Sequence, residues 1–162
     1  MPDILVIIGS MSDKEHALKV VETLDSLGIK ARVEIVSAHR TPDKVKALVE
    51  NAEKEGVYVF IAIAGLSALL PSLIAAYTIK PVIGVPVKRA LEGLDSLLSI
   101  AQTPQGIPVA CVGIDNAVNA ALLAAEIVCL QKTEVAEKLL EYRNSLKRNV
   151  EQSAEELRKL LG

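Results

Sequence analysis

The sequence ILVIIGSMSD at residues 4–13 contains the pattern that decides the fold. Its first five residues are apolar and rich in β-branched side chains, which favours a strand buried on both faces. Glycine and serine then end the strand, and Ser12 with Glu15 gives the S-x-x-E spacing of a helix N-terminus. Apolar residues recur at helical spacing over 17–27, and Gly28 marks the end of this helix. A strand followed directly by a helix is the repeating unit of an α/β fold.

The same alternation continues through four further apolar runs. They read ARVEIV at 31–36, VYVFIAIA at 57–64, PVIGVPV at 81–87 and PVACVGI at 108–114. Strands that alternate with helices pair in parallel and are covered on both faces. We therefore expect a flavodoxin-like three-layer α/β/α sandwich whose five-stranded parallel sheet has the order 2-1-3-4-5. Because internal repeats and linkers are absent, we also expect one domain over residues 1–162.

Two helices are expected after the fifth strand. The first is rich in alanine and covers 116–128, and the second is long and amphipathic, beginning at about Thr133. The second helix carries apolar residues at helical spacing: Val135, Leu139, Tyr142, Leu146, Val150, Leu157 and Leu161. Since the sheet is complete before this helix begins, we expect it to pack partly on a neighbouring subunit. Packing on its own domain is the alternative.

The composition restricts the partners of the protein. Hydrophobic residues make up 51% of the chain and charged residues 23%, a globular balance with an apolar surplus that indicates extra buried surface, such as a subunit interface. Eighteen Lys and Arg against twenty Asp and Glu give a net charge of −2, so no nucleic-acid or membrane partner is expected. No stretch approaches the ~20 apolar residues of a membrane span, and the N-terminus lacks a basic signal segment, so we expect a cytoplasmic location.

Several common kinds of site are poorly supported. Cys111 and Cys129 lie in apolar stretches without CxxC spacing or a nearby histidine, which predicts buried free thiols rather than a metal or redox site. The loop at 9–13 lacks the three glycines of a dinucleotide motif and the lysine of a P-loop. Aromatic residues that would stack on a flavin are absent from the loops after the first three strands. A phosphoacceptor receiver needs an aspartate where this chain has Ala64 and Gly65.

The loops after the first three strands are the expected place for a ligand. In open α/β sheets, ligands bind beyond the carboxyl ends of the strands, where the strand order reverses. The loop at 9–13 places a glycine, two serines and a helix N-terminus where backbone N–H groups can hold an anion such as phosphate. Helix capping by Ser12, with Asp13 stabilising the positive end of the helix, explains the same residues equally well.

The second loop reads SAHRTP at 37–42 and contains the best catalytic candidate. Its threonine and proline are typical of a helix N-cap and first turn, whereas His39 and Arg40 have no such structural reason to be there. An imidazole titrates near neutrality and moves protons in both directions, and a guanidinium binds phosphate with paired hydrogen bonds. The other histidine, His16, is expected to be a solvated surface residue.

The third loop reads AGLSALLP at 64–71. Gly65 would allow either close approach of a ligand or a tight turn. Leu66 and Leu69 would either form the wall of a pocket or face another subunit. The spacing of these residues favours neither interpretation.

Taken together, GSMSD, SAHRTP, AGLSALLP, PVIGVPV, GLDSLLSIAQTPQGIPV and NAALLAAEI resemble the PurE family, the 5-(carboxyamino)imidazole ribonucleotide mutases of purine biosynthesis. The resemblance extends from about Ile4 through the terminal helix, and its second half is most similar to the bacterial and archaeal mutase branch. It implies transfer of a carboxylate from the exocyclic nitrogen of an aminoimidazole ribonucleotide to a ring carbon. It also implies a homo-octamer that needs no cofactor and no metal.

The resemblance assigns a role to each candidate residue. His39 matches the family's proton-transfer histidine, which protonates the departing nitrogen and later takes the proton from the ring carbon. Arg40 and Ser10 match positions at the phosphate, and Asp13 matches a position that accepts hydrogen bonds from ribose hydroxyls. The supporting positions of the pocket correspond to Ser12, Ser37 and Gly65.

One departure from the family pattern concerns the third loop. Where the mutase pattern reads AGGAAHLPG, this chain has Leu69 in place of the second active-site histidine, and Leu66 and Ser72 in place of glycines. Leucine cannot hydrogen-bond a carboxylate, and this loss would raise the barrier by ~1 to 3 kcal/mol. Two alternatives to a mutase follow: the related branch that carboxylates aminoimidazole ribonucleotide with free carbon dioxide, and a noncatalytic ribonucleotide-binding paralogue.

Overall fold

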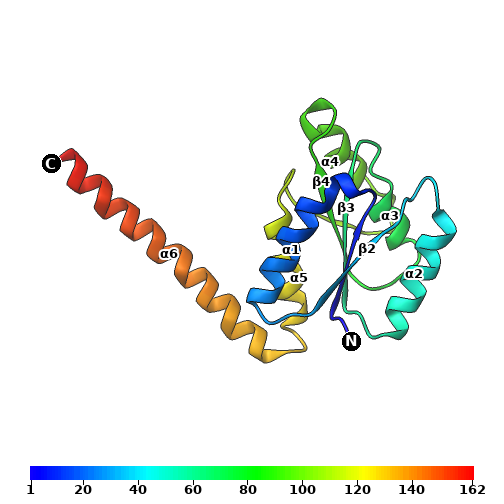
Figure 1. The fold of residues 1–162 in the computed structure, drawn as a ribbon, viewed down its shortest axis with the longest axis horizontal. Coiled ribbons are helices and arrows are strands. Elements are labelled where there is room, and N and C mark those ends of the chain that lie inside the picture. The colour runs from blue at the N-terminus through cyan, green and yellow to red at the C-terminus, as the bar shows by residue number, and fades with distance from the viewer.

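Five parallel strands form the centre of the protein, seen in a computed structural model of residues 1–162 (Figure 1). The strands are β1 (Ile4–Ile8), β2 (Ala31–Ile35), β3 (Val59–Gly65), β4 (Val82–Val87) and β5 (Ala110–Cys111). Their order is β2-β1-β3-β4-β5, with every neighbouring pair parallel, as the sequence predicted. β5 is shorter than its apolar run because only two of its residues pair with β4.

Helices cover both faces of this sheet. They are α1 (Lys14–Ser26), α2 (Pro42–Lys54), α3 (Leu70–Ala75), α4 (Leu94–Ala101), α5 (Ala117–Val128) and α6 (Thr133–Leu161), with short 3-10 turns η1 (Met11–Asp13) and η2 (Leu91–Gly93). One hydrophobic core joins the sheet to α1, α5 and the start of α6, and a second core joins it to α2, α3 and α4. The predicted three-layer sandwich is therefore confirmed.

The central strand β1 shows why its sequence is apolar throughout. All five of its residues are buried. Successive side chains of a strand point to opposite faces, so Ile4 and Val6 enter the core beneath α1 and α5, whereas Leu5 and Ile7 enter the core beneath α2. A strand buried in this way places its carboxyl end, and the loop that follows, at a fixed position on one edge of the sheet.

The end of α1 was predicted correctly, but its start was not. Gly28 has a φ of 75° just after α1, the left-handed conformation that glycine adopts most readily at a helix end. The predicted capping box of Ser12 and Glu15 is wrong. Ser12 lies inside η1, which precedes α1, so the free N–H groups at the start of this helical segment lie closer to the N-terminus than predicted. Ser10 takes the capping role, and its Oγ accepts a hydrogen bond from the Ser12 N–H at 3.3 Å.

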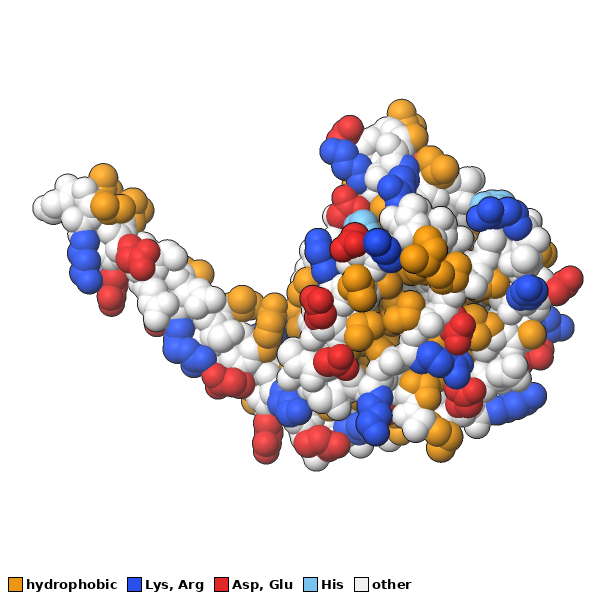
Figure 2. Space-filling model, in the orientation of Figure 1, with side chains coloured by type: hydrophobic (Ala, Val, Ile, Leu, Met, Phe, Trp, Pro, Cys, Tyr) orange, Lys and Arg blue, Asp and Glu red, His pale blue; other side chains and the backbone are white.

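The terminal helix α6 packs on the rest of the chain only at its beginning. Val135 and Leu139 are buried against the core that contains α5. Beyond them, α6 projects away from the sheet (Figure 1), and Leu146, Val150 and Leu157 remain exposed. Figure 2 shows hydrophobic side chains along the side of α6 that faces the body of the protein. Packing on its own domain therefore accounts for only the first part of the apolar stripe.

None of the helices combines the length and the apolar character that crossing a membrane requires.

Candidate functional site

The loops after β1, β2 and β3 meet around a pocket of about 380 Å³. Their proximity follows from the strand order, since β1 lies between β2 and β3. The pocket is lined by every candidate residue from the sequence: Ser10, Ser12, Asp13, Ser37, His39, Arg40 and Gly65. A larger cavity of about 860 Å³ lies near the amino ends of β4 and β5 and contains none of these residues. The chemistry of the smaller pocket therefore defines the candidate site.

The loop between β2 and α2 is held closed by its own hydrogen bonds. The Thr41 N–H donates to the Ser37 carbonyl at 2.8 Å, and the Thr41 hydroxyl donates to the same oxygen at 3.0 Å. In return, the Ser37 N–H donates to Thr41 Oγ1 at 3.2 Å. Thr41 therefore precedes α2 as predicted, but its hydroxyl closes the loop and makes no capping bond to the helix.

The same loop orients Arg40 and leaves His39 free. Ser37 Oγ accepts hydrogen bonds from Arg40 Nε at 3.2 Å and from the Arg40 backbone N–H at 3.3 Å. Because Nε is bound in this way, the two terminal nitrogens of the guanidinium remain available to a ligand. His39 is exposed and lines the pocket, and its imidazole makes no hydrogen bond within the chain. Both ring nitrogens are therefore available to hydrogen-bond a bound molecule.

The loop after β1 presents hydroxyl groups and a carboxylate. The Ser12 hydroxyl donates to Ser10 Oγ at 3.2 Å, so the two side chains lie side by side at the amino end of α1. The side chain of Asp13 is only 6% exposed, although it lines the pocket. Its hydrogen bonds within the chain end on Oδ1, which leaves Oδ2 free to accept from a ligand.

Arg89 also lines the pocket and was not predicted from the sequence. It follows the end of β4, and its Nη2 donates to Asp13 Oδ1 at 2.7 Å and to the Ser12 carbonyl at 2.9 Å. The only sequence signal was its place just after a strand that adjoins β3. The switch-point rule indicates the loops after the first three strands, so it did not predict a site residue after β4.

Gly65 has a clear structural reason to be glycine. A Cβ atom at this position would lie 2.7 Å from Cγ of Arg89, too close for two carbon atoms. Of the two interpretations from the sequence, close approach applies, but the group that approaches is a side chain of this protein. The backbone of Gly65 does not require positive φ, so a tight turn is not the reason.

The loop after β3 forms an apolar wall of the pocket. Leu66 and Leu69 both line it, and Leu69 is 40% exposed. Leu66 has a φ of 57°, a left-handed conformation in which residues with a Cβ are strained. The mutase pattern has glycine at this position, where a left-handed conformation carries no such strain.

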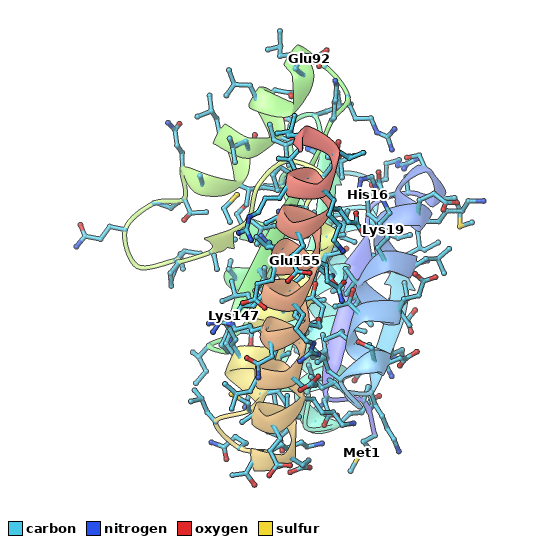
Figure 3. All side chains as sticks on the ribbon, turned by 90° about the vertical axis from the view of Figure 1, so that its left-hand side faces the viewer. Met1, His16, Lys19, Glu92, Lys147 and Glu155 are labelled. Carbon is cyan, nitrogen blue, oxygen red and sulfur yellow. The ribbon has the colours of Figure 1, made fainter.

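The expectation that His16 is a solvated surface residue was wrong. Its side chain is only 19% exposed, and its Nε2 lies 3.1 Å from Oδ1 of Asp115. Figure 3 shows His16 on α1, toward the end of the molecule opposite Met1. Asp115 is far away in the sequence, so this pair follows from the packing of α1 beside the start of α5. His16 does not line the pocket.

No group of three or more His, Cys, Asp or Glu side chains is arranged to hold a metal ion. Cys111 and Cys129 are free, as predicted, but they are half-buried rather than fully buried. Burial raises the pKa of the Cys111 thiol above its ordinary value, which keeps this group protonated and unreactive at neutral pH.

The charges of the pocket suit an anionic ligand. Its lining includes two guanidinium groups, on Arg40 and Arg89, and one carboxylate, on Asp13. Hydroxyl groups and the amino end of a helix add further hydrogen-bond donors for a phosphate. His39, whose imidazole makes no hydrogen bond within the chain, lies among these groups. The fold and the pocket thus define a doubly wound α/β protein whose pocket combines possible anion-binding groups with an unpaired histidine.

The family can be identified from comparison with known proteins. Residues 3–149 match the family model described as AIR carboxylase. Because this match covers most of the chain, the protein belongs to the AIR carboxylase family, whose members include the PurE proteins. The family membership expected from the sequence motifs is confirmed.

Several relatives are similar over nearly their full length. The chain is 49% identical over 157 residues to the N5-carboxyaminoimidazole ribonucleotide mutase of Methanocaldococcus jannaschii, covering 97% of this chain and 98% of the relative. It is 47% identical to the enzyme of the same name from Thermotoga maritima, covering 99% and 94%. The crystal structure of Treponema denticola PurE superposes with a TM-score of 0.89 at 30% identity, covering 97% and 99%.

Proposed function

We propose that this protein is an N5-carboxyaminoimidazole ribonucleotide mutase, moving a carboxylate from the exocyclic nitrogen of the substrate to a ring carbon. The observation that carries the proposal is the pocket, which unites an exposed, unpaired His39 with Arg40, Asp13 and two serine hydroxyls. Relatives nearly half identical in sequence bear the name of this activity. The reaction is an isomerisation, so a site that binds, orients and transfers protons is sufficient for it.

Different residues of the pocket bind the phosphate and the ribose of the substrate. Arg40, held by Ser37, presents its terminal nitrogens to the substrate phosphate, and Ser10 adds a hydroxyl beside it. Asp13 offers its free Oδ2 to the ribose hydroxyls. Ser12 and Gly65 support these groups from the adjoining backbone. Binding the phosphate and the ribose fixes the position of the aminoimidazole ring relative to His39.

His39 carries the proton transfers. In its protonated form it donates a proton to the exocyclic nitrogen as the carboxylate leaves as carbon dioxide. The ring carbon then attacks the carbon dioxide, and the neutral imidazole takes the proton that this carbon loses. One side chain thus returns to its starting state after each turnover. The exposed imidazole, without a partner in the chain, is suited to reach both positions.

Leu69 is the residue that favours a second candidate activity. It contributes an apolar wall to the pocket where a mutase-type histidine would hydrogen-bond the migrating carboxylate. The second activity is carboxylation of aminoimidazole ribonucleotide by free carbon dioxide. A noncatalytic ribonucleotide-binding protein is the remaining alternative, against which the intact pair of His39 and Arg40 argues.

A paired turnover assay tests the proposal. Purified protein receives either the carboxyamino ribonucleotide or the uncarboxylated ribonucleotide with bicarbonate and dissolved carbon dioxide, at matched concentrations. We expect faster product formation from the carboxyamino substrate. Preference for free carbon dioxide would assign the protein to direct carboxylation, and no product from either substrate would indicate a noncatalytic paralogue.

We further propose that residues 1–162 act as one domain that assembles into a cytoplasmic homo-octamer and binds neither nucleic acid nor membrane. The exposed apolar residues of α6 and their position on a projecting helix support assembly, because such a surface is normally covered.

The assembly is directly measurable. At micromolar concentration, light scattering should give about eight times the mass of the 17.3 kDa chain. Changing Leu146 and Val150 to serine should lower this mass, because both residues lie on the exposed stripe of α6. Changing Lys147, which lies between them in the sequence, to serine serves as the control. A monomer mass for the unmodified protein would refute the octamer.

A further inference from the structure

We propose that Arg89 is a positioning residue of the substrate site, which holds Asp13 in the orientation that receives the ribose hydroxyls. This inference deepens the proposed function and rests on it. Arg89 comes from the loop after β4, outside the three loops that supply the other site residues. It acts on the substrate through Asp13.

The contact between the two side chains is strong and directional. Arg89 Nη2 directs one N–H to Oδ1 of Asp13 and the other to the Ser12 carbonyl, at 2.7 Å and 2.9 Å. The guanidinium therefore binds both the carboxylate and the backbone of the loop that carries it. With Oδ1 occupied, Oδ2 remains for the ligand, so the contact decides which oxygen faces the substrate.

Asp13 depends on this contact because of its burial. Its side chain is 6% exposed, and Arg89 is the only cation within ion-pair distance of it. A carboxylate removed from water needs hydrogen bonds or a counter-charge to offset the cost of its desolvation. The side chain of Arg89 is 37% exposed, so it can reach Asp13 without itself losing all its hydration.

A glycine at position 65 leaves the space that the Arg89 side chain occupies. From the end of β4 it crosses over Gly65 at the end of β3 and reaches the loop after β1. Its Cγ occupies the space that a side chain at position 65 would need. Gly65 and Arg89 therefore form one structural unit, in which the glycine makes room for the arginine that orients Asp13.

Steady-state kinetics with the carboxyamino ribonucleotide test this unit. For Arg89→Met, we expect KM to rise roughly tenfold to hundredfold, with a much smaller change in kcat, because the ribose contact weakens while His39 is untouched. Arg89→Lys should recover part of the loss, since an ammonium can pair with Asp13 but cannot bind two oxygens in the same geometry. Gly65→Ala should raise KM in the same direction by displacing Arg89.

Lys88→Met is the matched control, because it removes a positive charge from the neighbouring position. Lys88 does not line the pocket, and its ammonium pairs with Glu92, which raises the pKa of Lys88. The KM of this variant should stay within about twofold of the parent value, as for most surface changes. Thermal unfolding of each variant separates loss of binding from loss of folding.

A double-mutant cycle decides whether Arg89 acts through Asp13. Adding Arg89→Met to an Asp13→Asn protein should cause little further loss, because the group that Arg89 orients is already changed. Multiplying effects of the two substitutions would overturn the proposal, as would an Arg89→Met protein that behaves like Lys88→Met.

Binding of the uncarboxylated ribonucleotide by calorimetry separates this proposal from the proposed function. An inactive parent protein that still binds this ligand, and loses affinity in Arg89→Met, would refute the mutase activity alone. An active parent whose Arg89→Met variant keeps full affinity would refute the role of Arg89 alone. A parent that neither turns over nor binds would refute both.

Discussion

Replacing His39 with asparagine is expected to lower kcat for the carboxyamino ribonucleotide by about 10²- to 10⁴-fold, the usual contribution of a positioned acid–base group. Asparagine has a similar size and can still hydrogen-bond, but it cannot take up or release a proton near neutral pH. KM should change little, because Arg40 and Asp13 keep the binding groups in place. Initial rates over a range of substrate concentrations would separate kcat from KM.

His16→Asn is the matched control for this experiment. It removes the only other histidine of the chain, which pairs with Asp115 and does not line the pocket. Its activity should remain close to that of the parent. An undiminished kcat in His39→Asn would show that another group transfers the proton, and the assignment of His39 would then be wrong.

The sequence was informative wherever a local pattern determines the structure. Apolar runs of β-branched residues predicted the five strands, and their alternation with helices predicted the parallel order that the structure shows. That order alone places the loops after β1, β2 and β3 together. The candidate residues of these loops, including His39 and Arg40, consequently line one pocket.

Contacts between distant segments could not be read in the same way. Arg89 reaches Asp13 across the end of β3, and His16 pairs with Asp115 near the start of α5. Neither pair has a periodicity or spacing that reveals it, because each depends on how packed elements place two side chains. The role of Gly65 was missed for the same reason, since the group that fills its missing side chain is Arg89.

The hydrogen bonds within loops lie between these two cases. Thr41 was predicted to cap α2, but its hydroxyl binds the carbonyl of Ser37. Serine and threonine hydroxyls can satisfy either a helix end or a nearby turn, so the residue type limits the choice without making it. In this chain the turn is the better partner, and it fixes the loop that presents His39 and Arg40.

Arg40→Ala is expected to weaken binding of the ribonucleotide by roughly tenfold to hundredfold, the value of a hydrogen bond to a charged group. Arg40 is oriented by Ser37 and has terminal nitrogens available for the phosphate. The loss should therefore depend on the phosphate itself. Calorimetry with the ribonucleotide and with the corresponding nucleoside, which lacks the phosphate, would show whether the difference in affinity between the two ligands disappears in the variant.

Lys46→Ala provides the control for charge, because Lys46 lies on the same helix that follows this loop, pairs with Glu50 and does not line the pocket. It should retain the preference for the phosphorylated ligand. If Arg40→Ala retained that preference as well, the phosphate would have to lie elsewhere in the pocket. Arg89 is the other guanidinium there, but two N–H groups of its Nη2 are already engaged by Ser12 and Asp13. Because the terminal nitrogens of Arg40 are free, we expect Arg40 to contribute more to phosphate binding than Arg89, and the affinities for the two ligands test this expectation.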